Sequence, residues 1–350
     1  MDDPVVVTYA VRASRDAIDA RADALLLEQT VELPRSALHD AGARGRAVGR
    51  VARIDPLSSG AYRVTLEQPA ATVGDDPAQL LNVLFGNSSL QPDIELEDVA
   101  LPAGLLRVLG GPRFGIAGIR GAAGVGQRAL TCTALKPMGL PVERLAALAA
   151  TFARAGIDLV KDDHGLADQA FAPFEPRVRA CQAAVNEVSA RTGRRTLYVP
   201  NLSGTPDRLR RQADIARAAG VGAVMVSPML VGLPAFHALV RDGLGVPVFA
   251  HPAFAGVLRA APEALLGRLF PAFGADAVIF PSYGGRFSYD RKTCGALARA
   301  LRHPADPLRP ALPVPAGGVA LERVPELLAF YGSDTALLVG AVHQYQEESA

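Results

Sequence analysis

The stretch Ile157-Asp158-Leu159-Val160-Lys161-Asp162-Asp163-His164 has the pattern of a short apolar strand that runs directly into polar residues. A helical segment follows at 175–192, and the next apolar strand is expected at 196–200. A strand, a polar loop and a helix in this order form the repeating unit of parallel sheets. The architecture therefore depends on how often this unit recurs.

The same unit recurs throughout the chain after Arg128. Its apolar strands are expected at 129–135, 157–161, 196–200, 223–227, 246–250, 277–280, 311–315 and 336–339. Eight parallel strands with helices between them predict a TIM (β/α)8 barrel, for which ~250 residues are typical. A doubly wound open sheet is less favoured, because no Gly-x-Gly-x-x-Gly turn follows the first strand.

Residues before about position 110 follow a different pattern. Strands are expected at 5–11, 45–54 and 61–67, and helices at 14–29 and 77–85. This order predicts a small α+β domain of the ferredoxin-like kind, with mostly antiparallel strands. The glycine-rich segment 110–126 is expected to connect it to the barrel. The predicted domains are therefore 1–125 and 126–350.

Charge and composition limit the possible partners. The chain has 350 residues, with 36 Lys plus Arg against 35 Asp plus Glu. This balance argues against nucleic acid or a membrane surface as the main partner. The start, Met1-Asp2-Asp3-Pro4, lacks the features of a signal peptide, and no apolar run reaches the roughly 18–20 residues of a membrane span. We therefore expect a cytoplasmic protein whose three cysteines are reduced core residues.

Only three of the 36 basic residues are lysines: Lys136, Lys161 and Lys292. Arginine stays charged in proteins, whereas a buried lysine can lose its proton and react as an amine. Lys136 and Lys161 each end a predicted strand, which is where barrel enzymes carry their catalytic groups. Lys292 falls on a predicted helix and is expected at the surface.

Polar residues or glycines also follow the other predicted strands. In chain order they are Asn201, Ser227, His251, Ser282 with Gly284, Gly317 with Gly318, and Gly340. At its position, His251 fits an ordinary polar residue as well as a ligand or base. The glycines after the last two strands lie where such barrels commonly bind phosphate through backbone N–H groups, and Ser282 and Gly284 could add to that site.

Lys161, Asp163 and His164 form the densest group of reactive side chains. A carboxylate and an imidazole suit a divalent metal, but a lysine ammonium repels one. A neutral lysine amine can add carbon dioxide and become a carbamate, which is an anionic oxygen ligand. A buried Lys–Asp ion pair at the end of a strand accounts for the same residues equally well, so both interpretations stay open.

These motifs resemble the large subunit of ribulose-bisphosphate carboxylase/oxygenase (RuBisCO), and more closely the RuBisCO-like proteins that do not fix carbon dioxide. The resemblance covers most of the chain. Its most specific parts are Leu135-Lys136-Pro137, Gly156–Asp163, Ala316-Gly317-Gly318 and Phe85-Gly86-Asn87. The stretches 161–170, 232–237 and 283–287 are similar to one branch, which includes enzymes that isomerise 5-methylthioribulose 1-phosphate in sulfur (methionine) salvage.

The resemblance implies one magnesium ion per site, held by a carbamylated Lys161 together with Asp163 and His164. Carbon dioxide would supply the carbamate. The third ligand of the family is a glutamate, so His164 is a departure. The resemblance further implies Lys136 or the carbamate as the base, and His251 as a residue that relays protons or binds a hydroxyl.

The resemblance also implies phosphate binding and a shared site between subunits. The phosphate contacts fall on Gly317, Gly318 and Gly340. Glu28 and Asn87 fall at positions that complete the barrel site of a neighbouring subunit, which implies an obligate homodimer.

Two departures from the carboxylating members define the implied reaction. The chain has Met138 where those members carry a second lysine, and Ser282–Ser288 contains no lysine where they have one. The implied activity is therefore isomerisation of 5-methylthioribulose 1-phosphate by magnesium-dependent proton transfer, without carbon fixation. One alternative is enolisation of 2,3-diketo-5-methylthiopentyl 1-phosphate or of another phosphorylated ketose or keto acid. A barrel that binds a sugar phosphate without catalysis is an alternative of another class.

Overall fold

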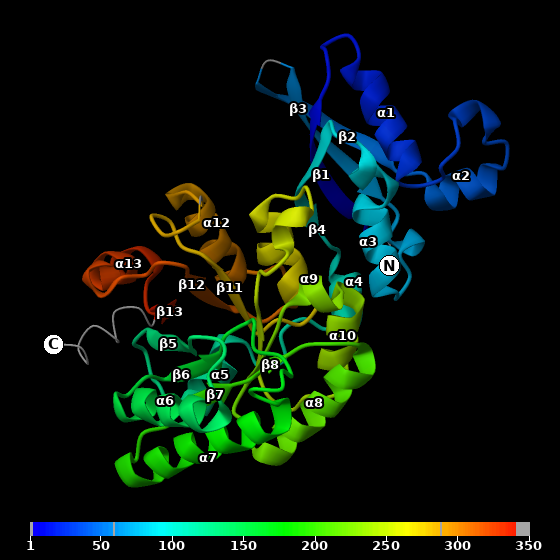
Figure 1. Cartoon of the computed structure of the whole chain (residues 1–350). Coiled ribbons are helices and arrows are strands. Elements are labelled where there is room, and N and C mark those ends of the chain that lie inside the picture. Colours follow the sequence, from blue (N-terminus) through cyan, green and yellow to red (C-terminus); the bar gives the residue numbers. More distant parts are fainter. Residues whose placement is uncertain (1–2, 59, 288, 341–350) are drawn as a thin grey trace. The chain divides into compact units, whose positions relative to one another are not determined.

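The computed structural model describes residues 3–58, 60–287 and 289–340, which fall into two compact units (Figure 1). Unit one contains the residues up to Gly111 together with Ala255–Phe273 and Ala305–Leu308. Unit two contains Pro112–Phe254, Gly274–Pro304 and the residues from Arg309 onward. The division into domains 1–125 and 126–350 stays a prediction.

Unit one is built on an antiparallel sheet with the strand order β2-β3-β1-β4. Its strands are β1 (Val5–Arg12), β2 (Arg50–Ser58), β3 (Ala61–Gln68) and β4 (Ile94–Ala100). Helix α1 (Ile18–Glu28) follows β1, and α3 (Pro77–Phe85) follows β3. This β-α-β-β-α-β order is the ferredoxin-like arrangement, so the expected α+β fold is confirmed.

Unit one differs from the sequence prediction in two places. The strand expected at 45–54 starts only at Arg50, because α2 (Ala41–Ala47) occupies the residues before it. The Asp40 carboxylate accepts a hydrogen bond from Ala43 N and so caps this helix. The prediction also missed β4 and α4 (Ala103–Leu109), although Ile94-Glu95-Leu96-Glu97 alternates in the way that indicates a strand.

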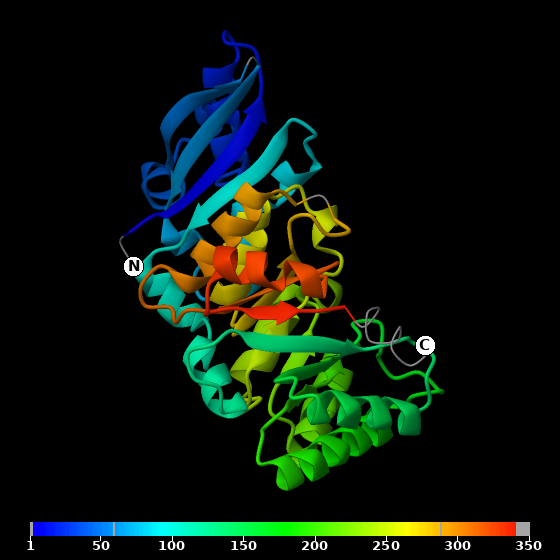
Figure 2. The same cartoon turned by 90° about the vertical axis from the view of Figure 1, so that its left-hand side faces the viewer.

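Unit two is a parallel barrel. Its strands are β5 (Leu130–Leu135), β6 (Leu159–Asp162), β7 (Leu197–Val199) with β8 (Asn201–Leu202), β9 (Val224–Val226), β10 (Val248–Ala250), β11 (Ala277–Pro281), β12 (Leu312–Ala316) and β13 (Ala336–Leu338). They form the sheets β13-β5-β6-β7 and β12-β11-β10-β9-β8. The sheets are joined where β7 runs into β8 at Pro200 and where Val319 pairs with Val339. Figure 2 shows β13 beside β5, and the predicted TIM barrel is confirmed.

Helices follow the strands of unit two as the β-then-α pattern requires. They are α6 (Val142–Arg154), α7 (Phe174–Thr192), α8 (Pro206–Ala219), α9 (Pro228–Val231), α10 (Leu233–Arg241), α12 (Arg291–Arg302) and α13 (Val324–Tyr331). Between β10 and β11 the chain forms a π-helical stretch, Glu263–Leu269, followed by α11 (Phe270–Ala272), and these residues are counted with unit one. Among the helices of the described residues, none combines the length and the apolar character that a membrane span requires.

Alternate strand residues fill the core of unit two. This core includes Leu130, Cys132, Leu159, Val199, Met225, Phe249, Ile279, Val314 and Leu338, all of them buried. Residues two apart on a strand point to the same face of the sheet. Four polar residues each lie two positions after one of these core residues. Lys161 follows Leu159, Asn201 follows Val199, Ser227 follows Met225 and His251 follows Phe249. The sequence therefore places polar side chains at the carboxyl end of the barrel, on the face that lines its interior.

The segment 110–126, expected to be a connection, contains a helix instead. Helix α5 (Gly115–Ala123) starts where the Asp276 carboxylate accepts hydrogen bonds from Phe114 N and Gly115 N, at 2.6 and 2.8 Å. It ends at Gly124, whose left-handed φ of 67° favours glycine. Ile119 packs into the core of unit two. The glycines concealed this helix, because their propensity argues against one.

Candidate active site

Lys161 lies at the carboxyl end of β6 and faces the inside of the barrel. Only 4% of the residue is exposed, and Nζ donates a hydrogen bond to the backbone oxygen of Asp162 at 2.9 Å. Burial lowers the pKa of Lys161 below its ordinary value, because a buried ammonium loses its hydration. Burial therefore makes the neutral amine, which is the form that can add carbon dioxide, more accessible than it is for an exposed lysine.

Asp163, two residues after Lys161, contacts Lys136 at the end of the neighbouring strand β5. Its Oδ2 lies 2.8 Å from Lys136 Nζ, while its Oδ1 lies 3.3 Å from His164 Nδ1 and accepts a hydrogen bond from Gly165 N at 2.9 Å. Burial opposes ionisation of Asp163, but the contacts with Lys136 and Gly165 outweigh it and lower the pKa of Asp163 to about 2. Asp163 is therefore an anion at neutral pH, paired with the β5 lysine.

His164 and His251 stack on each other, with ring centroids 4.3 Å apart and planes 11° from parallel. His251 Nδ1 accepts a hydrogen bond from Ala253 N at 3.1 Å, so the proton of a neutral ring lies on Nε2. Burial, followed by the charge of Lys161, lowers the pKa of His251 to about 2. Burial also lowers the pKa of His164. Both imidazoles are therefore neutral at physiological pH, and His251 belongs to the same cluster as Lys161.

The donor atoms decide which residues could hold a metal ion. Within residues 3–58, 60–287 and 289–340, no three His, Cys, Asp or Glu side chains lie together so that they could hold one. Asp163 and His164 supply a carboxylate and an imidazole, and magnesium needs further oxygen ligands. Lys161 can supply an oxygen only as a carbamate. The residues fit magnesium on that condition.

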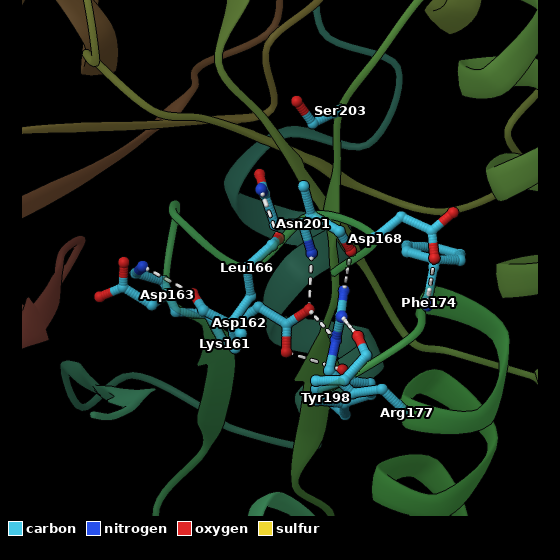
Figure 3. A network of polar contacts seen from close by, with 12 residues as sticks. Lys161, Asp162, Asp163, Leu166, Asp168, Phe174, Arg177, Tyr198, Asn201 and Ser203 are labelled. Atoms are coloured by element: carbon cyan, nitrogen blue, oxygen red, sulfur yellow. Dashed lines mark hydrogen bonds and ion pairs between the residues drawn. The ribbon is translucent and has the colours of Figure 1, made fainter. Parts of the chain in front are cut away.

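A buried ion pair lies beneath this cluster. Asp162 follows Lys161 and points to the opposite face of the sheet, where Arg177 of α7 meets it (Figure 3). Arg177 Nε lies 3.2 Å from Asp162 Oδ2, and both side chains are completely buried. The Tyr198 hydroxyl donates to Asp162 Oδ1 at 2.8 Å, and Asn201 N donates to Oδ2 at 3.1 Å. Burial raises the pKa of Asp162, and the charge of Arg177 opposes this shift.

Arg177 and Asn201 also hold the loop 163–172, which carries Asp163 and His164. Both side chains donate hydrogen bonds to backbone oxygens of this loop (Figure 3). Arg177 donates to Ala172 and Ala167 at 2.6 and 2.8 Å, and Asn201 donates to His164 and Leu166 at 3.1 and 2.9 Å. The positions of Asp163 and His164 therefore depend on a side chain of β8 and on a side chain of α7.

The glycine group predicted to bind phosphate lies at the ends of β11 to β13. Gly317 and Gly318 have left-handed φ angles of 84° and 102°, and a Cβ on Gly318 would approach Arg286 N at 3.2 Å. A Cβ on Gly317 would lie 2.9 Å from the Phe287 ring, so the protein itself packs closely against both glycines, and their role in phosphate binding stays a prediction. Among the described residues, no atom lies within 4 Å of the position of a Cβ on Gly340, and Gly284 has a φ of 66°. The Ser282 hydroxyl lies 3.1 Å from Tyr331 Oη, so it already has a hydrogen-bond partner within the protein.

Glu28 and Asn87 belong to unit one, where Asn87 Nδ2 donates a hydrogen bond to Glu28 Oε1 at 3.1 Å. The two residues are thus brought together although 59 positions separate them. Their role toward a neighbouring subunit stays a prediction.

Sequence reasoning missed the supporting side chains. Arg177 falls within a predicted helix, where an arginine is normally exposed, and Tyr198 falls within a predicted strand. Asp162 lies within the reactive strand end, but its position in the sequence indicated no role of its own. The alternation of inward and outward strand residues is the signal that could have separated Asp162 from Lys161 and Asp163.

The chain is similar to proteins of one family. A family model for the ribulose bisphosphate carboxylase large chain, catalytic domain, matches residues 115–263. A Rubisco-like protein from Rhodopseudomonas palustris has a crystal structure with 51% identity and a TM-score of 0.92, covering 97% of this chain and 94% of that one. The 5-methylthioribulose-1-phosphate isomerase of Rhodospirillum rubrum is 49% identical over 97% of this chain and 91% of its own length. A 2,3-diketo-5-methylthiopentyl-1-phosphate enolase of Geobacillus thermodenitrificans is 36% identical over 79% of this chain and 69% of its own length.

Proposed function

This chain belongs to the RuBisCO-like protein family, and we propose that it isomerises 5-methylthioribulose 1-phosphate by proton transfer, without fixing carbon dioxide. The observation that carries the proposal is the contact of Lys136 with Asp163 beside the buried Lys161. These residues offer an amine base, an anionic ligand and a lysine suited to carbamylation within one barrel end. The similarity to the Rhodospirillum rubrum isomerase over 97% of the chain supports this substrate.

Proton transfer in this site needs a base next to the substrate carbonyl. The Lys136 side chain is 43% exposed, so it can reach a ligand, while Asp163 orients its amine. A magnesium ion bound to Asp163 would compete with Lys136 for the carboxylate. When bound, magnesium would supply positive charge for the oxygen that gains charge as the neighbouring carbon loses a proton.

The ketone moves two carbons along the chain, so two successive proton removals are required. The neutral His251, with its proton on Nε2, can donate a hydrogen bond to a substrate oxygen. The carbamate on Lys161 is the second candidate base. Met138 stands where carboxylating relatives carry a lysine, and its side chain is 57% exposed. We propose that it offers an apolar surface to the methylthio group.

The reaction can be tested by proton NMR of 5-methylthioribulose 1-phosphate with the protein, magnesium and bicarbonate in deuterated water. Conversion into a methylthio-ketopentose 5-phosphate is the expected result. Deuterium incorporation without conversion would favour the second candidate, enolisation as named for the Geobacillus thermodenitrificans relative. No exchange by folded protein that binds magnesium would contradict both and favour a barrel that binds a sugar phosphate without catalysis.

Substitution of Lys136 by methionine is expected to lower the rate of deuterium incorporation by about 100- to 10,000-fold, because general-base catalysis typically contributes on this scale. The matched control is Lys292→Met, since Lys292 is an exposed lysine on α12 and should leave the rate unchanged. Full exchange by the Lys136→Met protein would exclude this lysine as the base.

We further propose that the protein works as a homodimer in which Glu28 and Asn87 complete the partner's site. Lys136→Met and Asn87→Ala proteins, each inactive alone, should then regain about one quarter of the wild-type activity after unfolding and refolding together. Half of the dimers would be mixed, and each mixed dimer would hold one intact site. Activity equal to the sum of the two separate variants would contradict the shared site.

A further inference from the structure

Two buried polar atoms at the mouth of the barrel have no protein hydrogen-bond partner among the described residues. They are Asn201 Oδ1 and Ser227 Oγ, in residues that are 2% and 4% exposed. Buried polar atoms are nearly always hydrogen-bonded, because leaving one unpaired costs free energy. These two atoms therefore indicate a place where a polar ligand group belongs.

The strand register places both residues on the inner face of the barrel. Asn201 on β8 pairs in register with Met225 on β9, and Met225 lies in the barrel core. Ser227 follows Met225 by two residues, so its side chain points to the same face. His251 N donates to Val226 O at 2.8 Å, which places Ser227 directly beside His251. The two unpaired atoms thus belong to the ring of residues that contains Lys161 and His251.

The surrounding contacts fix the orientation of both groups. Asn201 Nδ2 is held by the backbone oxygens of His164 and Leu166, so Oδ1 points away from that loop. Ser227 precedes α9, but its side chain makes no capping hydrogen bond to that helix. Serine at such a position usually caps the helix with its hydroxyl. Here the hydroxyl is left for another partner.

The chemistry of the two atoms limits the groups that can hydrogen-bond with both. A carboxamide oxygen only accepts hydrogen bonds, whereas a serine hydroxyl donates or accepts. A hydroxyl can donate to Asn201 Oδ1 and accept from Ser227 at the same time. A keto oxygen accepts from Ser227 but leaves Asn201 Oδ1 unpaired. We infer that Asn201 and Ser227 bind a hydroxyl group of the substrate's carbon chain.

The inference rests on the proposed function and makes it more specific. Of the two substrates considered, 5-methylthioribulose 1-phosphate carries hydroxyls at carbons 3 and 4, whereas the 2,3-diketo compound carries ketones at carbons 2 and 3. Carbons 2 and 3 take part in the first proton transfer and carbon 4 only in the second, so during the first transfer the hydroxyl at carbon 4 is the one assigned to Asn201 and Ser227. This pair selects the hydroxylated substrate.

The test compares 5-methylthioribulose 1-phosphate with its 4-deoxy analogue in wild-type and Ser227→Ala proteins. Deuterium incorporation at carbon 3 can be followed for both compounds. The wild type should prefer the hydroxylated compound by at least about 10-fold in kcat/KM. Ser227→Ala should lose about 5- to 10-fold on that compound and nothing on the analogue, and Ser227→Thr, which keeps a hydroxyl, should recover most of the loss.

The outcomes separate this inference from the proposed function. An equal loss on both compounds in Ser227→Ala would assign Ser227 a purely structural role and overturn the inference, even if the isomerase reaction is found. If the wild type exchanges neither compound, the proposed function fails. Calorimetric binding of the two compounds, with magnesium and bicarbonate, then decides the inference separately. Equal affinities, or no binding of either compound, would overturn it.

Discussion

Replacement of Lys161 by alanine is expected to lower magnesium-dependent proton exchange by at least about 1000-fold. Among the described side chains of the cluster, Asp163 and His164 offer one carboxylate and one imidazole, and Lys161 as a carbamate would supply the third ligand. Charge stabilisation by a metal ion is worth several kcal/mol, and each 1.36 kcal/mol is a factor of ten in rate. The rate of exchange by deuterium NMR measures this effect directly.

A second measurement does not depend on activity. In the wild type, calorimetric affinity for magnesium should rise when bicarbonate is added, because a carbamate turns Lys161 from a repelling cation into a ligand. Lys161→Arg should lose this response as completely as Lys161→Ala, since a guanidinium keeps the charge but cannot form the carbamate. Lys292→Ala is the control, because Lys292 is exposed. Bicarbonate-dependent magnesium binding in Lys161→Ala would contradict the proposed carbamate.

The recurring unit of an apolar strand, a polar loop and a helix predicted the barrel, and the change from apolar to polar residues after Val160 predicted a reactive strand end. The same reasoning found Lys136 and His251, which lie with Lys161 in one cluster. Local sequence carries this information, because the change from apolar to polar residues takes place within a single strand and the turn that follows it.

Contacts between distant segments could not be predicted in this way. Helix α5 depends on the carboxylate of Asp276, which lies 161 residues away from Gly115. The pairing of Asp162 with Arg177 depends on which face of α7 meets the sheet. The sequence alone does not specify which face of α7 packs against the sheet, because the neighbours of each arginine in α7 do not distinguish a buried arginine from an exposed one. Tertiary packing decides which of them is buried.

Arg177→Met is expected to give the largest loss of stability in this chain. The substitution would leave the Asp162 carboxylate buried without its cation, and breaking a buried ion pair typically costs about 3–5 kcal/mol in the free energy of unfolding. It would also remove the two hydrogen bonds that Arg177 donates to the loop 163–172. The melting temperature should fall by roughly 2–4 °C for each kcal/mol, which gives a decrease on the order of 10 °C.

The control for this prediction lies on the same helix. Arg179 pairs with Glu175 at 2.9 Å, but the two side chains are 53% and 42% exposed. Exposed pairs of this spacing contribute only about 0.3–0.5 kcal/mol, so Arg179→Met should leave the melting temperature nearly unchanged. Equal melting temperatures for the two variants would show that burial of the Asp162–Arg177 pair has no energetic weight.

A double-mutant cycle then separates the charge from the loop contacts. Asp162→Asn removes the buried charge. Its single side-chain oxygen can take the place of Oδ2 and accept from Asn201 N, and its amide nitrogen can then donate to the Tyr198 hydroxyl. The double variant Asp162→Asn, Arg177→Met should therefore be less destabilised than the sum of the single variants, because no uncompensated carboxylate remains. The double variant still lacks both Arg177 hydrogen bonds to the loop that carries Asp163 and His164. If those bonds position the loop, its magnesium affinity should stay below that of Asp162→Asn, even where its stability recovers. Recovery of both quantities together would mean that Asn201 alone suffices to hold the loop.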